Sequence, residues 1–376
     1  MGITWKDICE YRKKLIAKHP SLNNLIIKSL QDSSISSKDL AGFIESVWSK
    51  DYQNEARLVF TPEFLEYNEP ELDMDCSLVA IENHTLTGCF LSYTKKYSYQ
   101  GTAIQTAHNT GLTVARDNGA VKDLTGGQKR GRGTGQLLWI EQMRMAFEKG
   151  YDATTYWLDT RHDKPGDSSR IFGNNKVTAQ ESRQIPIMAK SFSLDRSCRY
   201  GNLNFLEKTG IRVVNAVFAG NPKNQSIEAD QDYRSAAAFL ESLEDICTPV
   251  PGQDLLRNKA RYCSGSLKSL LMNFKQDSKT IGIMYGFTIP VNEWDNYFQV
   301  DGFFFKPGLD WKTKREMILL AEKTIIERYG SFSCLIPANC TNEKLWKHGY
   351  VPAESQNLII NSLKDLGDWN LPIELR

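Results

Sequence analysis

The chain has 376 residues, a length that predicts roughly two to three domains, each large enough to bury its own core. Apolar residues make up 41% and charged residues 24% of the chain, as in ordinary globular proteins. The 46 Lys and Arg residues nearly balance the 45 Asp and Glu residues, so the formal net charge is +1. This balance removes the whole-chain argument for a nucleic-acid binder, although it allows a local basic site.

No apolar run approaches the roughly 18 to 20 residues that a membrane-spanning helix needs, and residues 1–16 lack the apolar core of a signal peptide. The eight cysteines form no Cys-x-x-Cys pair, and the histidines show no metal-ligand spacing. We therefore predict no metal, no membrane partner, reduced thiols and a cytoplasmic location.

The first third of the chain predicts helices followed by strands. Two amphipathic helices come first, because apolar residues recur there at helical spacing. Residues 76–81 and 86–93 predict a hairpin, since a polar turn separates two apolar runs. Residues 104–116 predict a further strand, in which Gly111 favours a bulge or a close approach.

A polar, glycine-containing stretch over residues 117–135 leads into the next predicted helix, which ends at Gly150. One face of this helix is apolar, formed by Leu137, Ile140, Met143 and Phe147. Residues 153–158 predict a strand. Residues 160–200 are polar and show no strong period, and so long a segment is usually functional or partly disordered.

The chain then repeats its order of elements. Residues 202–208 predict a short helix and residues 211–218 a strand, and the polar residues 220–225 predict a linker. The second half predicts a helix, two strands, a long helix and a strand, at residues 236–243, 280–290, 297–305, 313–329 and 332–336. Because residues 206–211 (LEKTGI) also resemble residues 345–350 (LWKHGY), we interpret the chain as a tandem duplication of one α+β unit.

The sharpest local signal is the sequence RGRGTG at residues 130–135, between a predicted strand and a predicted helix. Its glycines let the backbone turn tightly, and the first turn of the helix adds unpaired N–H donors and the positive end of the helix dipole. Lys129, Arg130 and Arg132 add positive charge. Together these features favour binding of a pyrophosphate or a similar anion.

Other glycine-rich motifs fit less well. A P-loop needs Lys and Ser or Thr after its last glycine, whereas Gln136 and Leu137 follow here, and the glycine spacing of a dinucleotide-binding loop is also absent. RNA-binding Arg-Gly-Gly tracts are repeated, whereas this sequence adjoins an amphipathic helix. A basic loop without any ligand is the structural alternative.

The sequence Arg-x-x-Gly-x-Gly after a strand, followed by Gln136-Leu137-Leu138 at the start of a helix, resembles the acyl-CoA-binding motif of the GNAT acyltransferase superfamily. The repeated layout resembles proteins that contain two GNAT units. The resemblance implies an α+β fold of two tandem units, each a mixed and mostly antiparallel sheet flanked by helices. We expect a cofactor-binding unit at residues 1–220, with insertions at 117–127 and 160–200, and a degenerate unit at residues 226–376.

The resemblance also implies acetyl-CoA, or another acyl-CoA, as co-substrate. The backbone of the strand would pair with the pantetheine arm, and the glycine loop would hold the pyrophosphate. Asn202 or Asn204 would supply the polar residue that family members often place beside the cofactor. The implied cofactor-binding residues are therefore Leu112, Thr113, Val114, Arg130, Gly131, Arg132, Gly133, Thr134, Gly135, Gln136, Asn202 and Asn204.

The chain departs from the family at several points. Val114 and Arg130 are 16 positions apart, whereas the family usually has about five residues there. The tyrosine that many members place four residues before the closing glycine is Leu206 here, so we expect Tyr200 to replace it as general acid, or the role to be absent. The second unit has Pro307 and a single glycine in its equivalent loop, and we expect it not to bind CoA well.

Direct transfer needs a base, an acid and an oxyanion donor. His108 is the candidate base, because its usual pKa is near neutrality and it belongs to the strand that precedes the loop. It shares a face with Leu112 and Val114 only if Gly111 forms no bulge. A merely hydrogen-bonded His108 is the alternative, as is a loop-capping role for Asp159, which otherwise orients an amine.

We therefore predict an acyltransferase that moves an acetyl group to an amine on a small molecule or a peptide. A catalytically degenerate GNAT-like protein that binds CoA as a sensor or interaction module is the alternative. RNA binding through Arg130 and Arg132 is a third hypothesis, which a steep salt dependence of RNA affinity would support, and we expect no nucleic-acid partner.

Overall fold

The computed structural model describes residues 2–51, 59–99, 102–115, 133–159, 180–200, 204–223, 226–243, 248–264, 267–291 and 294–365. The α-helices are α1 (Trp5–Lys18), α2 (Ser37–Asp51), α3 (Pro62–Asn68), α4 (Thr134–Glu148), α6 (Leu194–Tyr200), α7 (Phe205–Phe218), α8 (Tyr233–Glu241), α9 (Gln253–Arg261) and α10 (Trp311–Tyr329). Short 3₁₀ helices are η1 (Pro20–Asn24), η2 (Glu69–Glu71), η4 (Ala338–Cys340) and η5 (Leu345–His348).

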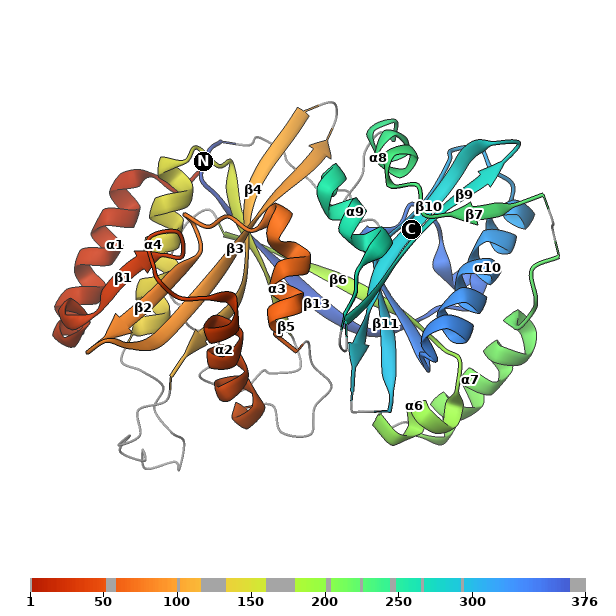
Figure 1. The fold of residues 1–376 in the computed structure, drawn as a ribbon, viewed down its shortest axis with the longest axis horizontal. Helices are drawn as coiled ribbons and strands as arrows, with labels where there is room; N and C mark the ends of the chain where they lie inside the picture. The colour runs from red at the N-terminus through yellow and green to blue at the C-terminus, as the bar shows by residue number, and fades with distance from the viewer. Residues whose placement is uncertain are drawn as a thin grey trace.

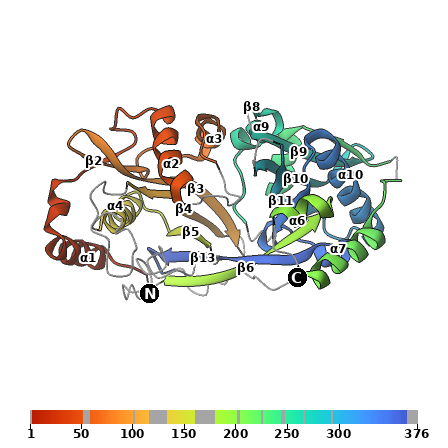
Figure 2. The same cartoon turned by 90° about the horizontal axis from the view of Figure 1, so that it is seen from below.

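The strands form one sheet, in the order β1-β2-β3-β4-β5-β13-β6-β12-β11-β10-β9-β7, with β8 paired to β9. Their bounds are β1 (Ile26–Ser29), β2 (Leu78–Glu82), β3 (Thr85–Tyr99), β4 (Thr102–Val114), β5 (Ala153–Asp159), β6 (Gln180–Ser191), β7 (Glu228–Asp230), β8 (Cys263–Ser264), β9 (Leu267–Gln276), β10 (Lys279–Pro290), β11 (Asn296–Phe305), β12 (Ser333–Pro337) and β13 (Val351–Ser362). Figure 1 shows two halves, and Figure 2 shows β6 and β13 running from one half into the other.

The two halves repeat the same order of elements. In the first half, β2, β3 and β4 are followed by α4, β5 and β6; in the second, β9, β10 and β11 are followed by α10, β12 and β13. The last strands are exchanged, because β13 pairs with β5 and β6 pairs with β12. Among the described strands only β4–β5 and β11–β12 pair in parallel. The predicted α+β class with a mixed, mostly antiparallel sheet is confirmed.

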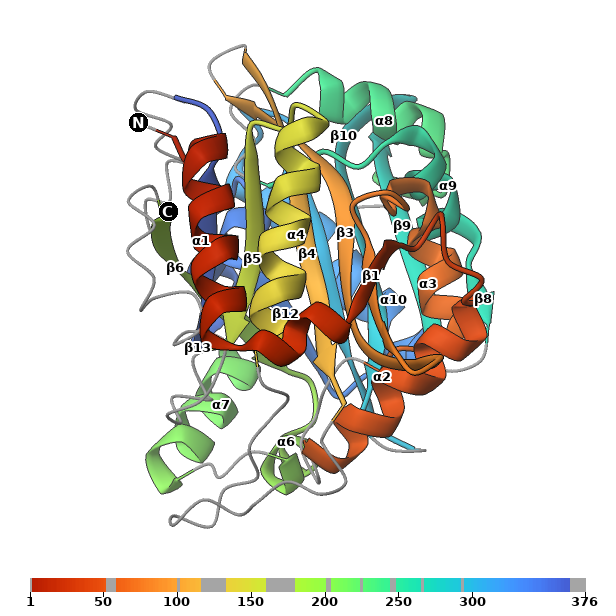
Figure 3. The same ribbon diagram turned by 90° about the vertical axis from the view of Figure 1, so that its left-hand side faces the viewer.

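Helices cover both faces of the sheet in the first half. Along β2, Leu78 and Ala80 pack into a core with α1 and α4, whereas Val79 packs into a core with α2 and α3. This alternation is the two-residue period of a strand buried on both faces. Figure 3 shows α1 and α4 side by side on one face.

The second half is layered in the same way. Apolar residues of α10 pack on one face of its strands, and those of α8 and α9 pack on the other. The two halves meet through a shared core, in which Phe64 of α3 lies 6.1 Å from Phe287 of β10, ring centre to ring centre. Within the described ranges, no helix is both long enough and apolar enough to cross a membrane.

Two local predictions are wrong. The strand predicted at residues 211–218 belongs to α7, which continues through Gly210. A capping box starts this helix, since the Asn204 side chain accepts a hydrogen bond from the Glu207 N–H and the Glu207 carboxylate accepts one from the Asn204 N–H. The helix that starts at this cap continues through Gly210, although glycine costs a helix about 1 kcal/mol of stability relative to Ala.

The segment at residues 160–200 is not uniformly irregular, because its described part contains β6 and α6. The similarity of residues 206–211 to residues 345–350 is also misleading, because the first lie within a helix and the second in η5 and its cap. The structural counterpart of β13 is β6. The predicted boundary at residues 220–226 stays a prediction, and strand pairing crosses it.

Candidate active site

Strand β4 contains a bulge at the position where the sequence predicted one. Cys89 of β3 pairs with Thr113 and Leu91 with Thr110, so Gly111 and Leu112 together oppose a single residue. Gly111 has φ +65°, a left-handed conformation that glycine adopts without steric cost. The bulge reverses the alternation of side chains, and residues before and after it face opposite sides of the sheet.

Strands β4 and β5 pair only along part of their length. The parallel ladder joins residues 106–109 of β4 to residues 153–156 of β5 and then stops. Beyond it, Thr113 pairs with β3 on one side, while Asp159 pairs with β13 on the other, so the two strands diverge. The Ala115 N–H donates to Thr87 of β3, which puts the Val114 N–H on the opposite edge, toward the divergence.

The N-terminus of α4 lies beside the divergent part of β4. A Cβ added at Gly135 would lie 3.5 Å from Val114 Cγ2 and 3.9 Å from Leu112 Cδ2. Gly133, the N-cap residue, has φ +91° and offers no side chain to cap the helix. A Cβ there would lie 3.3 Å from both His19 and Leu22. Glycine at 133 therefore permits both the turn and the close packing of η1.

Among the described residues, no acidic side chain stands at the N-cap or in the first turn of α4, so nothing there compensates the positive end of the helix. Every other α-helix in the described ranges has an acidic residue at its N-cap or in its first turn. In α4 the first turn is Thr134, Gly135 and Gln136, without an acidic residue. Negative groups stabilise a helix at this end, so the first turn of α4 retains its attraction for an external anion.

The equivalent helix of the second half, α10, begins with an acidic residue. Asp310 is the N-cap of α10, and its carboxylate accepts hydrogen bonds from the Thr313 N–H (2.8 Å) and hydroxyl (3.0 Å). These hydrogen bonds hold the pKa of Asp310 below its usual value, so the carboxylate stays charged there. This negative charge would repel an anion at the start of α10. The expectation that the second unit binds CoA weakly is compatible with this arrangement and stays a prediction.

His108 lies at the apex of the divergence, where its backbone pairs with that of Thr155. Its Nδ1 is 2.9 Å from Thr155 Oγ1. Burial, and secondly the charge of Lys95, lower the pKa of His108 to about 3, so the imidazole is neutral. Because of the bulge, His108 faces away from α4, whereas Leu112 packs toward it.

The side of the sheet that carries His108 leads to the junction of the two halves. Lys95 of β3 forms an ion pair with Glu71 of η2. Across the junction, Lys259 of α9 donates hydrogen bonds to Tyr67 Oη (3.0 Å) and to Asp301 Oδ2 (2.6 Å). Asp301 is the bulge residue of β11, the strand that corresponds to β4.

Two tyrosines complete this junction cluster. Tyr93 of β3 and Tyr285 of β10 are 5% and 2% exposed, and neither hydroxyl has a hydrogen-bond partner within the described residues. Burial raises the pKa of both tyrosines, so both hydroxyls stay protonated and can donate hydrogen bonds. No sequence motif marks this cluster, because its members come from separate elements and meet only in the folded chain.

The structure separates two predicted residues from α4. The Tyr200 hydroxyl donates to Asp295 Oδ2 at 2.6 Å, and its ring stacks on Phe332, both in the second half. Asn204 caps α7, which lies in the other half of the molecule from α4 (Figure 1). Tyr200 and Asn204 thus make local contacts in the second half, and the roles predicted for them stay predictions.

Several predicted residues remain untested. Arg130, Gly131, Arg132 and Asn202 lie outside the described residues. Asp159 ends β5, where its backbone pairs with Gln356, and its side chain is outside the description. The structure thus brings together residues 112–114 and 133–136, with His108 at the closed end of the divergence.

No protein-family model and no curated protein sequence matches the chain. Solved structures do match it. A Saccharomyces cerevisiae N-myristoyltransferase with bound myristoyl-CoA is 10% identical, with a TM-score of 0.59, covering 91% of this chain and 79% of that chain. Another structure of that enzyme, with myristoyl-CoA and inhibitors, is 12% identical with a TM-score of 0.60, covering 92% and 81%. A GCN5-related N-acetyltransferase from Anabaena variabilis is 6% identical with a TM-score of 0.55, covering 90% and 73%.

Proposed function

We propose that the chain, whose fold is similar to those of N-myristoyltransferase and a GCN5-related N-acetyltransferase, is an acyl-CoA-dependent acyltransferase of the GNAT type. The observation that carries the proposal is the divergence of β4 and β5, with the uncompensated N-terminus of α4 at its opening. An acyl-CoA could use both features. Its polar pantetheine arm would lie along a strand edge, and its anionic pyrophosphate would be held at the start of the helix.

The donor site would extend from β4 to α4. The free backbone edge of residues 112–114 would pair with the pantetheine arm, and the first-turn N–H groups of α4 would bind the pyrophosphate. Arg130 and Arg132, which precede Gly133 in the sequence, would add charge-assisted contacts. The similar N-myristoyltransferase structures contain bound myristoyl-CoA, which supports an acyl-CoA ligand here.

The reaction would be a direct transfer. The acceptor nitrogen attacks the thioester carbonyl, a C–N bond forms, the C–S bond breaks, and the leaving thiolate takes up a proton. The Val114 N–H, on the free edge of β4, is the candidate donor to the developing oxyanion. Positioning of the two reactants would supply much of the rate acceleration.

The acceptor would approach from the side of the sheet that carries His108. In this proposal His108 is the proton acceptor, because its ring is neutral. A pKa of about 3 means that the ring holds a proton only briefly. The rate should therefore rise with pH according to the pKa of the acceptor amine rather than with a step near the usual histidine pKa. Asp159 stays a second candidate for orienting the amine.

The proposal names acetyl-CoA as donor, an amine of a small molecule or peptide as acceptor, and the cytoplasm as compartment. Six cysteines are free thiols, as a reducing compartment favours: Cys9, Cys76, Cys89, Cys198, Cys334 and Cys340. The alternative is a CoA-binding sensor without turnover. The pKa of His108 favours this alternative over an enzyme that depends on a strong general base.

Calorimetric titration with acetyl-CoA tests the donor site. Wild type should bind at micromolar concentration, Arg130→Glu should not, and Lys306→Glu in the equivalent loop of the second unit should bind as wild type does. Release of free CoA thiol across a panel of amines then separates enzyme from sensor. The absence of binding by folded wild type would refute both.

A further inference from the structure

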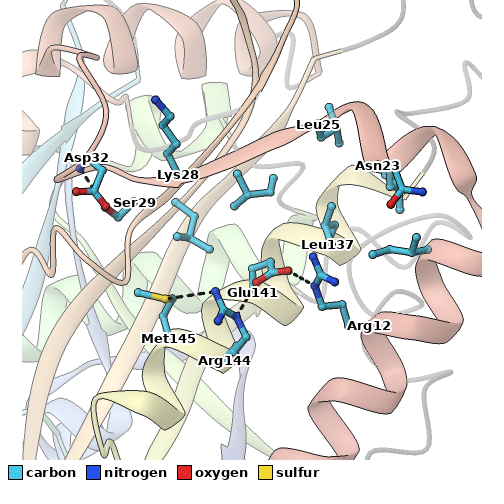
Figure 4. A pocket seen from close by; sticks show the side chains of 14 residues that line it. Arg12, Asn23, Leu25, Lys28, Ser29, Asp32, Leu137, Glu141, Arg144 and Met145 are labelled. Atoms are coloured by element: carbon cyan, nitrogen blue, oxygen red, sulfur yellow. Dashed lines mark hydrogen bonds and ion pairs between the residues drawn. The ribbon is translucent and has the colours of Figure 1, made fainter.

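An open pocket lies outside the donor site, between α1, η1, β1 and α4 (Figure 4). Its volume is about 640 Å³, within the range of roughly 300 to 1,000 Å³ that is usual for small-molecule sites. Every residue that lines it belongs to the described part of the chain. Neither β4 nor β5 contributes to its lining, so it is distinct from the divergence at which acyl transfer is proposed.

Two arginines share one carboxylate at one end of the pocket. Glu141 of α4, whose side chain is 8% exposed, forms ion pairs with Arg12 Nε of α1 and with Arg144 Nε at 2.8 Å. Because Arg144 also pairs with Glu148 at 3.1 Å, its charge is balanced twice, and Arg12 is the guanidinium group that can take a further anionic partner. Figure 4 shows both arginines turned toward Glu141 from opposite sides.

The Arg12 guanidinium keeps donors for a ligand. Its link to Glu141 uses Nε, and within the described residues its two Nη atoms have no hydrogen-bond partner. The Arg12 side chain is 45% exposed, so a ligand can reach it. The Nη atoms of Arg144 contact Glu148 and the sulfur of Met145 instead. A planar guanidinium edge of this kind suits a carboxylate, which can accept two parallel N–H bonds.

Between the arginines and the polar residues Lys28, Ser29 and Asp32 at the other end, aliphatic side chains line the pocket. Leu25 and Ile27 line it from the edge of the sheet, and Leu78 and Leu137 line it from β2 and α4. The carboxylate of Asp32, at the far end in Figure 4, already accepts a hydrogen bond from the Ser29 hydroxyl at 2.7 Å. The lining therefore combines an anion-binding end with an aliphatic surface.

From this arrangement we propose that the pocket binds a small amphipathic carboxylate. The carboxylate group sits on the Nη edge of Arg12, beside Glu141 and Arg144, and the apolar body lies on Leu25 and Leu78. The bound molecule contacts both α1 and α4 and so strengthens a helix pair that the Arg12–Glu141 ion pair already joins. This site is separate from the proposed acyl-CoA site and does not depend on it.

Titration of the full chain with three matched eight-carbon probes tests the proposal: octanoate, octanol and octylamine. Octanoate should bind about tenfold tighter than octanol, because a charge-assisted pair is added to the same apolar contact. Octylamine should bind more weakly than octanol. Arg12→Gln should reduce octanoate affinity to that of octanol. The control Lys6→Gln, on α1 but 84% exposed at its side chain and away from the pocket, should have no effect.

Three results would overturn the proposal. Equal affinity for octanoate and octanol would mean that the arginines contribute no anion site. Undiminished octanoate binding by both Arg12→Gln and Arg144→Gln would place the ligand elsewhere, and this comparison stays valid if one variant is unstable. Displacement of octanoate by acetyl-CoA would make the pocket part of the donor site. Octanoate binding without any acetyl-CoA binding would instead refute the acyltransferase proposal and leave the pocket standing.

Discussion

The substitution Gln136→Glu should change stability and acyl-CoA affinity in opposite directions. Gln136 is the third residue of α4, whose first turn has no acidic residue and whose N-cap is a glycine. A carboxylate there interacts favourably with the helix dipole and the free N–H groups, so stability should rise by about 0.3 to 1 kcal/mol. The same carboxylate should repel a pyrophosphate held at that turn.

The repulsion can be estimated from Coulomb's law. At a separation of about 6 Å and an effective dielectric constant of about 20, one pair of like unit charges costs about 3 kcal/mol. Salt screening reduces this energy for a partly exposed residue, so we expect a loss of about 2 kcal/mol. That loss corresponds to an acetyl-CoA affinity roughly 30-fold weaker than that of wild type.

Calorimetry with acetyl-CoA and denaturant unfolding of the same samples measure the two effects. The matched control is Gln253→Glu, which places the same new charge in the first turn of α9, also behind a glycine N-cap. This control should gain less stability, because Asp254 already places a carboxylate in the first turn of α9, and it should keep wild-type affinity for acetyl-CoA. If Gln136→Glu is stabilised and yet binds acetyl-CoA as tightly as wild type, the pyrophosphate does not lie at α4 and the reasoning is refuted.

Three further predictions test the fold and the site. Because the folded-state pKa of His108 is about 3, below its unfolded value of about 6.5, its contribution is complete above pH 6.5 and is lost as the pH falls. In the His108→Gln variant, the free energy of unfolding should therefore fall less steeply as the pH is lowered from 6 to 4, with a slope smaller by about 1.4 kcal/mol per pH unit. Denaturant titrations at each pH measure this slope, and the same pH dependence in wild type and variant would contradict the prediction. Gly111→Ala, at φ +65°, should destabilise by about 1 to 2 kcal/mol, whereas Gly210→Ala within α7 should stabilise, and thermal unfolding should show the opposite signs. Glu322→Gln leaves the buried Lys190 ammonium without its carboxylate and should cost about 3 to 5 kcal/mol, whereas the double variant Lys190→Met, Glu322→Met should cost less in the same unfolding assay.

The sequence predicts best those features that depend on local chemistry. The glycines before α4, the apolar face of that helix and the bulge at Gly111 all reflect backbone or burial requirements within a few residues. For this reason the position of the donor site could be proposed before the fold was known. The sequence also shows that the first turn of α4 contains neither Asp nor Glu.

Other features depend on contacts between distant residues. Tyr93, Tyr285 and Lys259 meet at the junction because two halves of the chain pack together, and no spacing in the sequence encodes that meeting. The prediction for α7 failed for a related reason. Its β-branched residues, such as Val213 and Val217, suggest a strand, but no sheet edge receives them, and the Asn204–Glu207 cap starts a helix instead.

The exchange of β6 and β13 joins the two halves in one continuous sheet. A GNAT-like unit whose last strand came from its own sequence would end in a free sheet edge, and such edges favour unwanted pairing. Here β6 and β13 pair with each other along residues 351–361, so the edge of each unit is closed by the other. Lys190 of β6 also forms its buried ion pair with Glu322 of α10, in the opposite half. The same strands that close the sheet hold β5, and so the far side of the β4–β5 divergence, in place. If the donor site lies at this divergence, as proposed, the second unit helps to shape it through β13, although the start of α10 is itself capped by the carboxylate of Asp310.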